Sequence, residues 1–247
     1  MSHYILQHIQ QARRQQHKLL AVLIDPDCAG EEQLIHLVEQ AQKGQADLLF
    51  VGGSLLLRDT LDPCITTIRD NCDIPVVLFP GSVMQLSSQA DALLFLSLIS
   101  GRNPEFLIGH QVIAAPYLSQ MDLEVMATGY MLIESGKPTT ASYMSGTNPI
   151  PHQKPEIAAS TAMAGELLGM KLIYMDGGSG AQIPISETMI RQVRQSVDIP
   201  IIVGGGINSA EKAQSNCQAG ADVIVVGNAL ETDPHLLQEM AQAIHEE

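Results

Sequence analysis

The chain has 247 residues, of which 45% are hydrophobic and 16% are charged, and its formal net charge is −14. Only 13 residues are Lys or Arg and no basic run occurs, which excludes a nucleic-acid partner and disfavours attraction to anionic lipid. Residues 1–17 are too polar for a signal peptide, and no apolar stretch reaches the roughly 18 residues of a membrane span. We therefore expect a cytoplasmic protein without a transmembrane segment.

Short apolar runs recur along the whole chain and alternate with amphipathic segments. Continuous apolar runs are typical of parallel strands that are covered on both faces. The predicted strands are, in order, 19–24, 46–51, 74–79, 92–98, 124–133, 171–175, 199–203 and 221–226. Eight β/α units in a chain of about 250 residues favour a single (β/α)8 TIM barrel over residues 1–247, with an open α/β sheet as the alternative.

Two segments depart from this repeat. Residues 58–71 offer only a short helical stretch between the second and third predicted strands. Residues 135–153 form a long segment with Gly, Pro, Ser and Thr throughout, and a long loop at the carboxyl end of a barrel strand is often functional. We therefore expect an irregular segment in place of one helix, and a lid over the active-site face.

Oxygen-bearing side chains follow the first two predicted strands. Asp25 ends the first strand and Ser54 follows the second. Active sites of these barrels lie at the carboxyl ends of the strands. One carboxylate and one hydroxyl there would suit Mg²⁺, which keeps waters and substrate phosphates among its ligands. The alternative is a helix cap, and this is the interpretation we give to Asp27.

Glycine-rich loops follow the last three predicted strands. They are Gly177-Gly178-Ser179-Gly180, Gly204-Gly205-Gly206 and Gly227-Asn228. Glycine lets backbone N–H groups approach an anion without an intervening Cβ, and barrel enzymes often bind phosphate with the loops after strands seven and eight. One such cluster would indicate only a tight turn, but three on consecutive strand ends predict a phosphate site.

Asp176 lies between the sixth predicted strand and its glycine loop. A carboxylate beside a bound phosphate ester can act as a general base. The alternative role is to stabilise the turn.

These motifs together resemble the geranylgeranylglyceryl phosphate synthase family, which includes the heptaprenylglyceryl phosphate synthases. The resemblance covers nearly the whole chain. It rests on Ile24-Asp25-Pro26-Asp27, Val51-Gly52-Gly53-Ser54, residues 97–104, Gly129-Tyr130-Met131-Leu132-Ile133, residues 174–181, Val203-Gly204-Gly205-Gly206-Ile207 and Val226-Gly227-Asn228.

The resemblance implies transfer of a polyprenyl group, expected to be geranylgeranyl, from its diphosphate to the 3-hydroxyl of sn-glycerol 1-phosphate. It also implies Mg²⁺ bound by Asp25 and Ser54, Asp176 as catalytic base, and a homo-oligomer. The implied glycerol phosphate residues are Tyr174, Met175, Asp176, Gly177, Gly178, Ser179, Gly180, Gly205, Gly206, Gly227 and Asn228. The chain departs from the family at Asp176, where members often carry Glu, so the acid is one methylene shorter.

An apolar groove is also expected for the prenyl tail. Its candidate lining residues are Leu96, Leu98, Met126, Tyr130 and Leu132. Two alternatives remain open at this stage, because phosphate loops recur in barrels of unrelated chemistry. One is a phosphosugar isomerase or flavin enzyme, and the other is a barrel that binds a phosphate ligand without catalysis.

Overall fold

The protein is a closed barrel of eight parallel strands that follow one another in chain order. The computed structural model describes residues 4–27, 30–227 and 235–246. The strands are β1 (Leu19–Ile24), β2 (Leu48–Val51), β3 (Val76–Leu78), β4 (Ala92–Leu98), β5 (Glu124–Leu132), β6 (Leu172–Asp176), β7 (Ile201–Gly204) and β8 (Val223–Val226). Leu19 of β1 pairs with Val223 of β8 and closes the barrel. The predicted TIM barrel is therefore confirmed, and the open-sheet alternative is wrong.

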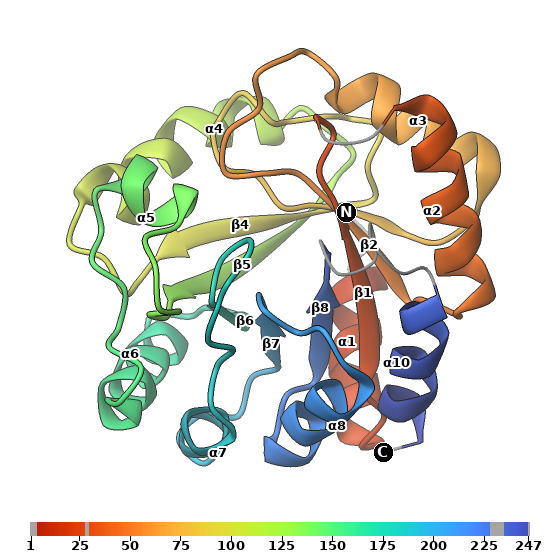
Figure 1. The fold of residues 1–247 in the computed structure, drawn as a ribbon. Helices are drawn as coiled ribbons and strands as arrows, with labels where there is room; N and C mark the ends of the chain where they lie inside the picture. Colours follow the sequence, from red (N-terminus) through yellow and green to blue (C-terminus); the bar gives the residue numbers. More distant parts are fainter. Residues whose placement is uncertain (1–3, 28–29, 228–234, 247) are drawn as a thin grey trace.

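Helices surround the barrel as an outer layer (Figure 1). The described helices, not all of them in this layer, are α1 (Tyr4–Arg14), α2 (Glu31–Lys43), α3 (Leu61–Asn71), α4 (His110–Leu118), α5 (Thr140–Ser145), α6 (Pro155–Leu167), α7 (Glu187–Arg194), α8 (Ala210–Ala219) and α10 (His235–His245), with a π-helical segment η1 (Glu105–Gly109) before α4. In the described part of the chain, no helix has the length and apolarity needed to cross a membrane.

Two apolar cores share the strands, because alternate side chains point to opposite faces of a sheet. Leu20 and Leu49 face outward and pack beneath the helices. Ala21 and Phe50 face inward and fill the barrel. Most residues on both faces are buried, which explains why the strands appear in the sequence as continuous apolar runs.

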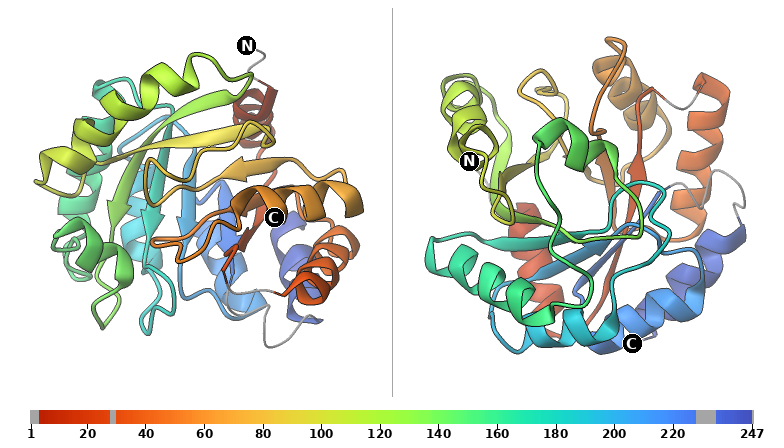
Figure 2. Two further views of the ribbon diagram at one scale, coloured as in Figure 1. Left: turned by 90° about the horizontal axis from the view of Figure 1, so that it is seen from above. Right: turned by 60° about the vertical axis from the view of Figure 1, so that its left-hand side comes forward.

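Helix α1 belongs to the inner core rather than to the outer layer. Its buried residues Ile5 and Ile9 pack with the inward-facing side chains of the barrel. The Glu124 carboxylate, at the start of β5, accepts hydrogen bonds from the N–H groups of Ile5 (2.8 Å) and Leu6 (2.9 Å). Seen from above, α1 and the green segment that carries α5 lie on opposite sides of the molecule (Figure 2, left). Helix α1 thus closes the end of the barrel where the strands begin.

The irregular segment does not lie at the predicted position. Residues 61–71 form a regular helix, α3, whose buried residues Leu61, Cys64, Ile65 and Ile68 have helical spacing. The connection without a helix is instead residues 79–91, between β3 and β4. Expecting the break at 58–71 was wrong, because that apolar spacing begins only after the irregular residues 58–60.

Candidate active site

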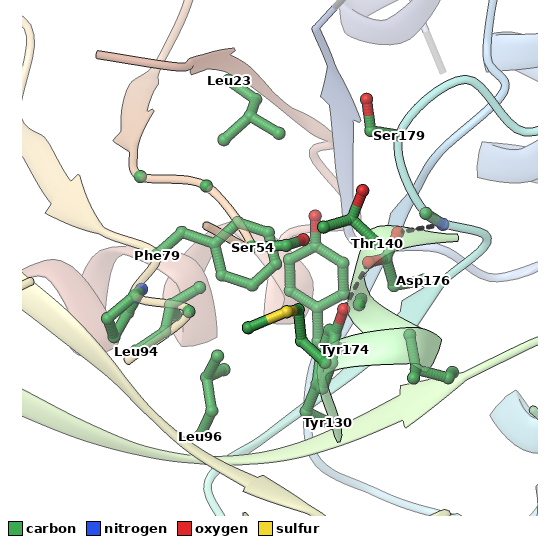
Figure 3. A pocket seen from close by; sticks show the side chains of 18 of the residues that line it. Leu23, Ser54, Phe79, Leu94, Leu96, Tyr130, Thr140, Tyr174, Asp176 and Ser179 are labelled. Carbon is green, nitrogen blue, oxygen red and sulfur yellow. Dashed lines mark hydrogen bonds between the residues drawn. The ribbon is translucent and has the colours of Figure 1, made fainter. Parts of the chain in front are cut away.

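A cavity of about 550 Å³ opens at the carboxyl ends of the strands. Every strand end contributes to its wall. The residues at or shortly after the eight strand ends are Asp25, Ser54, Phe79, Leu98, Leu132, Asp176, Gly205 and Gly227. Figure 3 shows side chains from several of these ends directed toward one space. The cavity therefore lies where barrel enzymes carry their active sites.

The glycine loops after β6 and β7 pack against each other at the rim of this cavity. Gly178, Gly180, Gly205 and Gly206 all line it. Gly205 has φ +84°, and a Cβ there would stand 2.8 Å from both the N and the O atom of Gly178. A side chain at this position would strain its own backbone and displace the facing loop.

Not every residue of the predicted phosphate site reaches the cavity. Met175 faces outward into the core beneath the helices, because it alternates with Tyr174 along β6. The N–H of Gly177 donates to the carbonyl of Gly204 (3.0 Å), and Gly177 does not line the cavity. Gly227 and Ser179 do line it. Asn228 lies outside the described residues.

Asp176 is buried at the end of β6, and both of its carboxylate oxygens accept hydrogen bonds. The N–H of Gly178 donates to Oδ1 (2.7 Å), and the Tyr130 hydroxyl donates to Oδ2 (2.5 Å; Figure 3). Burial raises the pKa of Asp176, although these two donors act in the opposite direction. A carboxylate with a raised pKa is a stronger proton acceptor once it is ionised. The geometry thus suits a general base.

Three aromatic rings form the wall beside Asp176. The rings of Phe79 and Tyr174 stack with centroids 4.8 Å apart, and Tyr130 meets Tyr174 edge-on at 5.7 Å. Gly204 makes room for this wall, because a Cβ there would stand 2.7 Å from the Tyr174 hydroxyl. Burial and the charge of Asp176 raise the pKa values of both tyrosines, so both phenols keep their protons.

Asp25 and Ser54 face the cavity from neighbouring strands, as predicted. The Asp25 carboxylate lies against the loop after β2, with Oδ2 3.2 Å from the point where a Cβ on Gly53 would stand. Its Oδ1 also accepts a hydrogen bond from the N–H of Asp27 (2.9 Å).

Gln85, which is not among the predicted site residues, holds this loop in place. The side chain is 4% exposed. Its Nε2 donates to the carbonyl of Gly53 (2.9 Å), and its Oε1 accepts from the N–H of Gly81 (3.1 Å). Gln85 therefore joins the loops after β2 and β3 next to Ser54. It lies in the irregular 79–91 segment, where no periodic pattern marks it.

Asp27 does not cap the helix that follows it. The residue before α2 is Gly30. The Asp27 carboxylate instead accepts hydrogen bonds from the Leu57 N–H and from the Thr60 hydroxyl (3.0 Å). These bonds lower the pKa of Asp27, with the Leu57 N–H as the largest cause. The predicted cap is wrong, because the folded chain brings the β2–α3 loop within reach of this carboxylate.

The cavity has an apolar branch that extends across β4. Leu94 and Leu96 line it from the inner face of the strand, and Leu93 and Phe95 line it from the outer face. A helix after β3 would normally cover this outer face, but residues 79–91 contain none. The branch continues to η1 and α4, where Phe106 and Ala114 line it, so the missing helix creates the groove.

The predicted lining of the groove is correct except at one position. Leu96, Leu98, Tyr130 and Leu132 line the cavity. Met126 is fully buried in the inner core of the barrel and does not. It lies near the start of β5, four residues before Tyr130 on the same face of the strand, and therefore deeper in the barrel than the cavity.

Segment 135–153 contains the short helix α5, and part of it covers the cavity. Thr140, Ala141, Met144 and Ser145 line the cavity from this helix. Thr139 caps α5, with its hydroxyl accepting from the N–H of Ser142 (3.2 Å). The segment thus has the position expected of a lid, and the structure shows it in one arrangement.

The fold and the position of the cavity place the chain among the (β/α)8 barrels that carry their sites at the carboxyl ends of the strands. The chain belongs to the PcrB family, whose model matches residues 10–247. Together with the relatives described next, this membership confirms the family resemblance found in the sequence, and it counts against a phosphosugar isomerase or a flavin enzyme.

Two curated relatives carry the name geranylgeranylglyceryl phosphate synthase. The protein from Chitinophaga pinensis is 56% identical, over 92% of this chain and 90% of its own length. The protein from Korarchaeum cryptofilum is 41% identical, over 94% of this chain and 96% of its own length.

A similar crystal structure is that of (S)-3-O-geranylgeranylglyceryl phosphate synthase from Thermoplasma acidophilum in complex with its substrate sn-glycerol-1-phosphate. It has a TM-score of 0.93 and 34% sequence identity, and the match covers 98% of this chain and 99% of that one.

Proposed function

We propose that the chain is a prenyltransferase that moves a polyprenyl group, expected to be geranylgeranyl, from its diphosphate to the 3-hydroxyl of sn-glycerol 1-phosphate. The observation that carries this proposal is a single cavity that joins a glycine-rich rim, a buried carboxylate and an apolar branch. The rim suits a phosphate, and the branch suits a hydrocarbon chain. The names of the relatives support the same reaction.

The acceptor would bind at the glycine loops. Backbone N–H groups around Gly180 and Gly205–Gly206 would bind its phosphate, with Gly227 beside them. Its 3-hydroxyl would then point toward Asp176, which lies directly before the first of these loops. The substrate in the Thermoplasma acidophilum structure supports this choice of acceptor.

The chemical step exchanges one C–O bond for another. The oxygen of the acceptor 3-hydroxyl forms a bond to C1 of the prenyl group, the bond from C1 to the diphosphate oxygen breaks, and the Asp176 carboxylate takes the proton. Tyr130 stays protonated and holds the carboxylate in position through its 2.5 Å hydrogen bond. The faces of Tyr130, Tyr174 and Phe79 would stabilise positive charge as it develops on the allylic carbon.

The proposal includes Mg²⁺ held by Asp25 and Ser54. Among the described residues, no group of three His, Cys, Asp or Glu side chains could hold a metal by itself. One carboxylate and one hydroxyl still fit Mg²⁺, because this ion takes its remaining ligands from water and substrate phosphates. When bound, Mg²⁺ would neutralise charge on the departing diphosphate.

We further propose that the protein works in the cytoplasm as a homo-oligomer. The η1–α4 surface supports association, because Ile108, Val112 and Tyr117 are 60%, 64% and 61% exposed there. Adjacent exposed apolar side chains are frequent in protein interfaces. Light scattering coupled to size-exclusion chromatography would test this, and a monomer at micromolar concentration would contradict it.

An assay with labelled sn-glycerol 1-phosphate and a series of prenyl diphosphates, with and without Mg²⁺, tests the reaction. We expect product only when both substrates and Mg²⁺ are present. Absence of product with every chain length, while both substrates bind, would favour a non-catalytic binding barrel.

The variant Asp25→Asn tests the metal site. The amide keeps the oxygen that accepts from the Asp27 N–H, so the loop should remain folded. We expect loss of turnover and of Mg²⁺-dependent diphosphate binding by calorimetry. The exposed Asp59→Asn serves as control. Unchanged Mg²⁺-dependent binding in Asp25→Asn would remove Asp25 from the site.

A further inference from the structure

The glycine-rich rim of the cavity has no positive side chain of its own. Among the described residues that line the cavity, none is Lys or Arg, whereas Asp25 and Asp176 both line it. Backbone N–H groups present dipoles to an anion but carry no net charge. In a chain of net charge −14, a phosphate at this rim would therefore meet mainly negative charge.

Lys137 lies just outside the cavity lining, in the segment between β5 and α5, and reaches the glycine loop. Its Nζ is 3.3 Å from the point where a Cβ on Gly180 would stand. Lys137 is exposed, and within the part of the chain that the structure describes its ammonium has no ion-pair or hydrogen-bond partner. Its charge is therefore available to a ligand held by this loop.

Residues on both sides of Lys137 contact the loop after β6. The Ser135 carbonyl accepts hydrogen bonds from the N–H groups of Gln182 (3.1 Å) and Ile183 (3.0 Å). On the other side, Thr139 packs so closely on Gly178 that a Cβ there would stand 2.6 Å from the Thr139 Cγ2. These contacts hold the segment that carries Lys137 against the loop that carries Gly180.

We propose that Lys137 is a binding residue for the phosphate of the glycerol phosphate acceptor. This inference rests on the function proposed above and adds to it the source of positive charge. The backbone amides would give the phosphate its orientation, and the lysine would neutralise part of its charge. The flexible stem of lysine and its compact charge suit a partner that enters and leaves with each turnover.

Calorimetry with sn-glycerol 1-phosphate on the full-length protein tests this role. We expect Lys137→Met to weaken binding by roughly 10-fold at low ionic strength, the scale of one charge-assisted hydrogen bond. Lys137→Arg should retain most of the affinity because it keeps the charge. Added salt should reduce the difference in sn-glycerol 1-phosphate affinity between the parent protein and Lys137→Met, because salt screens exposed charges. Binding of the prenyl diphosphate should not change.

Lys171→Met is the matched control. Lys171 is also exposed, but it lies at the other end of the barrel, directly before β6. Equal affinity in the parent protein and Lys137→Met, or equal losses in Lys137→Met and Lys171→Met, would overturn the role of Lys137. A larger loss for the prenyl diphosphate than for the acceptor would overturn it as well. If the parent protein itself binds no sn-glycerol 1-phosphate, the proposed function fails, which is a distinct result.

Discussion

At the amino end of the barrel, the carboxylates of Asp47, Asp91 and Asp222 accept hydrogen bonds from backbone N–H groups near the starts of β1, β3 and β7. Each of these aspartates precedes its own strand and bonds to the neighbouring one. Asp222 also pairs with Arg194 at 2.9 Å. The carboxylates at this end are therefore used to join strands.

At the carboxyl end of the barrel, the aspartate carboxylates have different partners. Asp25 and Asp176 bond to N–H groups only two residues ahead of them, Asp176 also accepts from Tyr130, and both line the cavity. Neither has a basic partner in the described lining. The comparison indicates that one end of the barrel is built for stability and the other for a ligand, which the following variants test.

The largest effect is expected at the amino end, from Asp222→Ala. Removing this buried carboxylate leaves the Ile201 N–H without its acceptor and the Arg194 guanidinium without its carboxylate partner, although Arg194 still donates to the carbonyls of Val197 and Ile199. We expect the free energy of unfolding to fall by about 3–5 kcal/mol, the usual range for breaking a buried ion pair. Urea unfolding measures it, with the exposed Asp73→Ala as control. Turnover per folded molecule should be unchanged, and a loss of turnover without a loss of stability would contradict the division between the two ends.

Asp176→Asn should show the opposite pattern, which is a loss of turnover without a loss of stability. The amide preserves size, so acceptor binding should remain, while turnover should fall by roughly 100-fold or more, the usual contribution of a positioned base. In the parent enzyme, turnover should decline as pH falls through the raised pKa of Asp176, because the base must be ionised. Asp176→Glu should retain substantial activity. Parent-like turnover in Asp176→Asn would show that the proton leaves by another route.

Asp176→Asn should also leave the protein no less stable at neutral pH. A carboxyl whose pKa is raised on folding binds protons more tightly in the folded state, so its ionisation disfavours folding as pH rises. Urea unfolding at neutral pH checks this. A stability loss as large as that of Asp222→Ala would assign Asp176 a structural role instead.

Variants of two glycines at the rim distinguish a position that contacts the ligand from a position whose backbone conformation requires glycine. In Gly227→Ala the new Cβ would meet only an ordinary contact, 3.4 Å from the Leu23 Cβ, so stability should hold while acceptor affinity falls by roughly 10-fold, or about 1.4 kcal/mol. Gly205→Ala should lower both stability and acceptor affinity, because the φ of +84° at Gly205 and its close approach to Gly178 exclude a side chain. Calorimetry and thermal unfolding distinguish them. Unchanged affinity in Gly227→Ala would remove this strand end from the phosphate site.

The smallest effect is expected for His245→Gln at the amino end. The hydrogen bond to Asp47 (3.0 Å) raises the pKa of His245. This contribution is fully present below the ordinary histidine pKa of about 6.5 and is lost as pH rises through the higher folded value. We expect a loss of about 0.5 kcal/mol near pH 5.5 and almost none near pH 8.5. An equal loss at both values would mean that the charged pair contributes nothing.

The sequence by itself determined the strands and the glycine loops, because both depend on local requirements. A strand buried on both faces must be apolar, so Leu48–Val51 appears as β2 inside the predicted range 46–51. Gly205 adopts a left-handed conformation that other residues rarely accept, and this requirement is visible in the sequence. The position of Asp25, Ser54 and Asp176 at the cavity was predictable, because the carboxyl end of a strand has a known place in a barrel.

The tertiary structure alone decided how those ends meet. The hydrogen bond between Tyr130 and Asp176 joins residues 46 positions apart, and Gln85 joins loops from different strands. No periodic pattern encodes such contacts, because they depend on the register of neighbouring strands and on irregular loops. The apolar branch arises from the absence of a helix at residues 79–91, and an absence leaves no motif to recognise. Lys137 likewise reaches the glycine loop only because the chain folds residues 135–139 against residues 178–183.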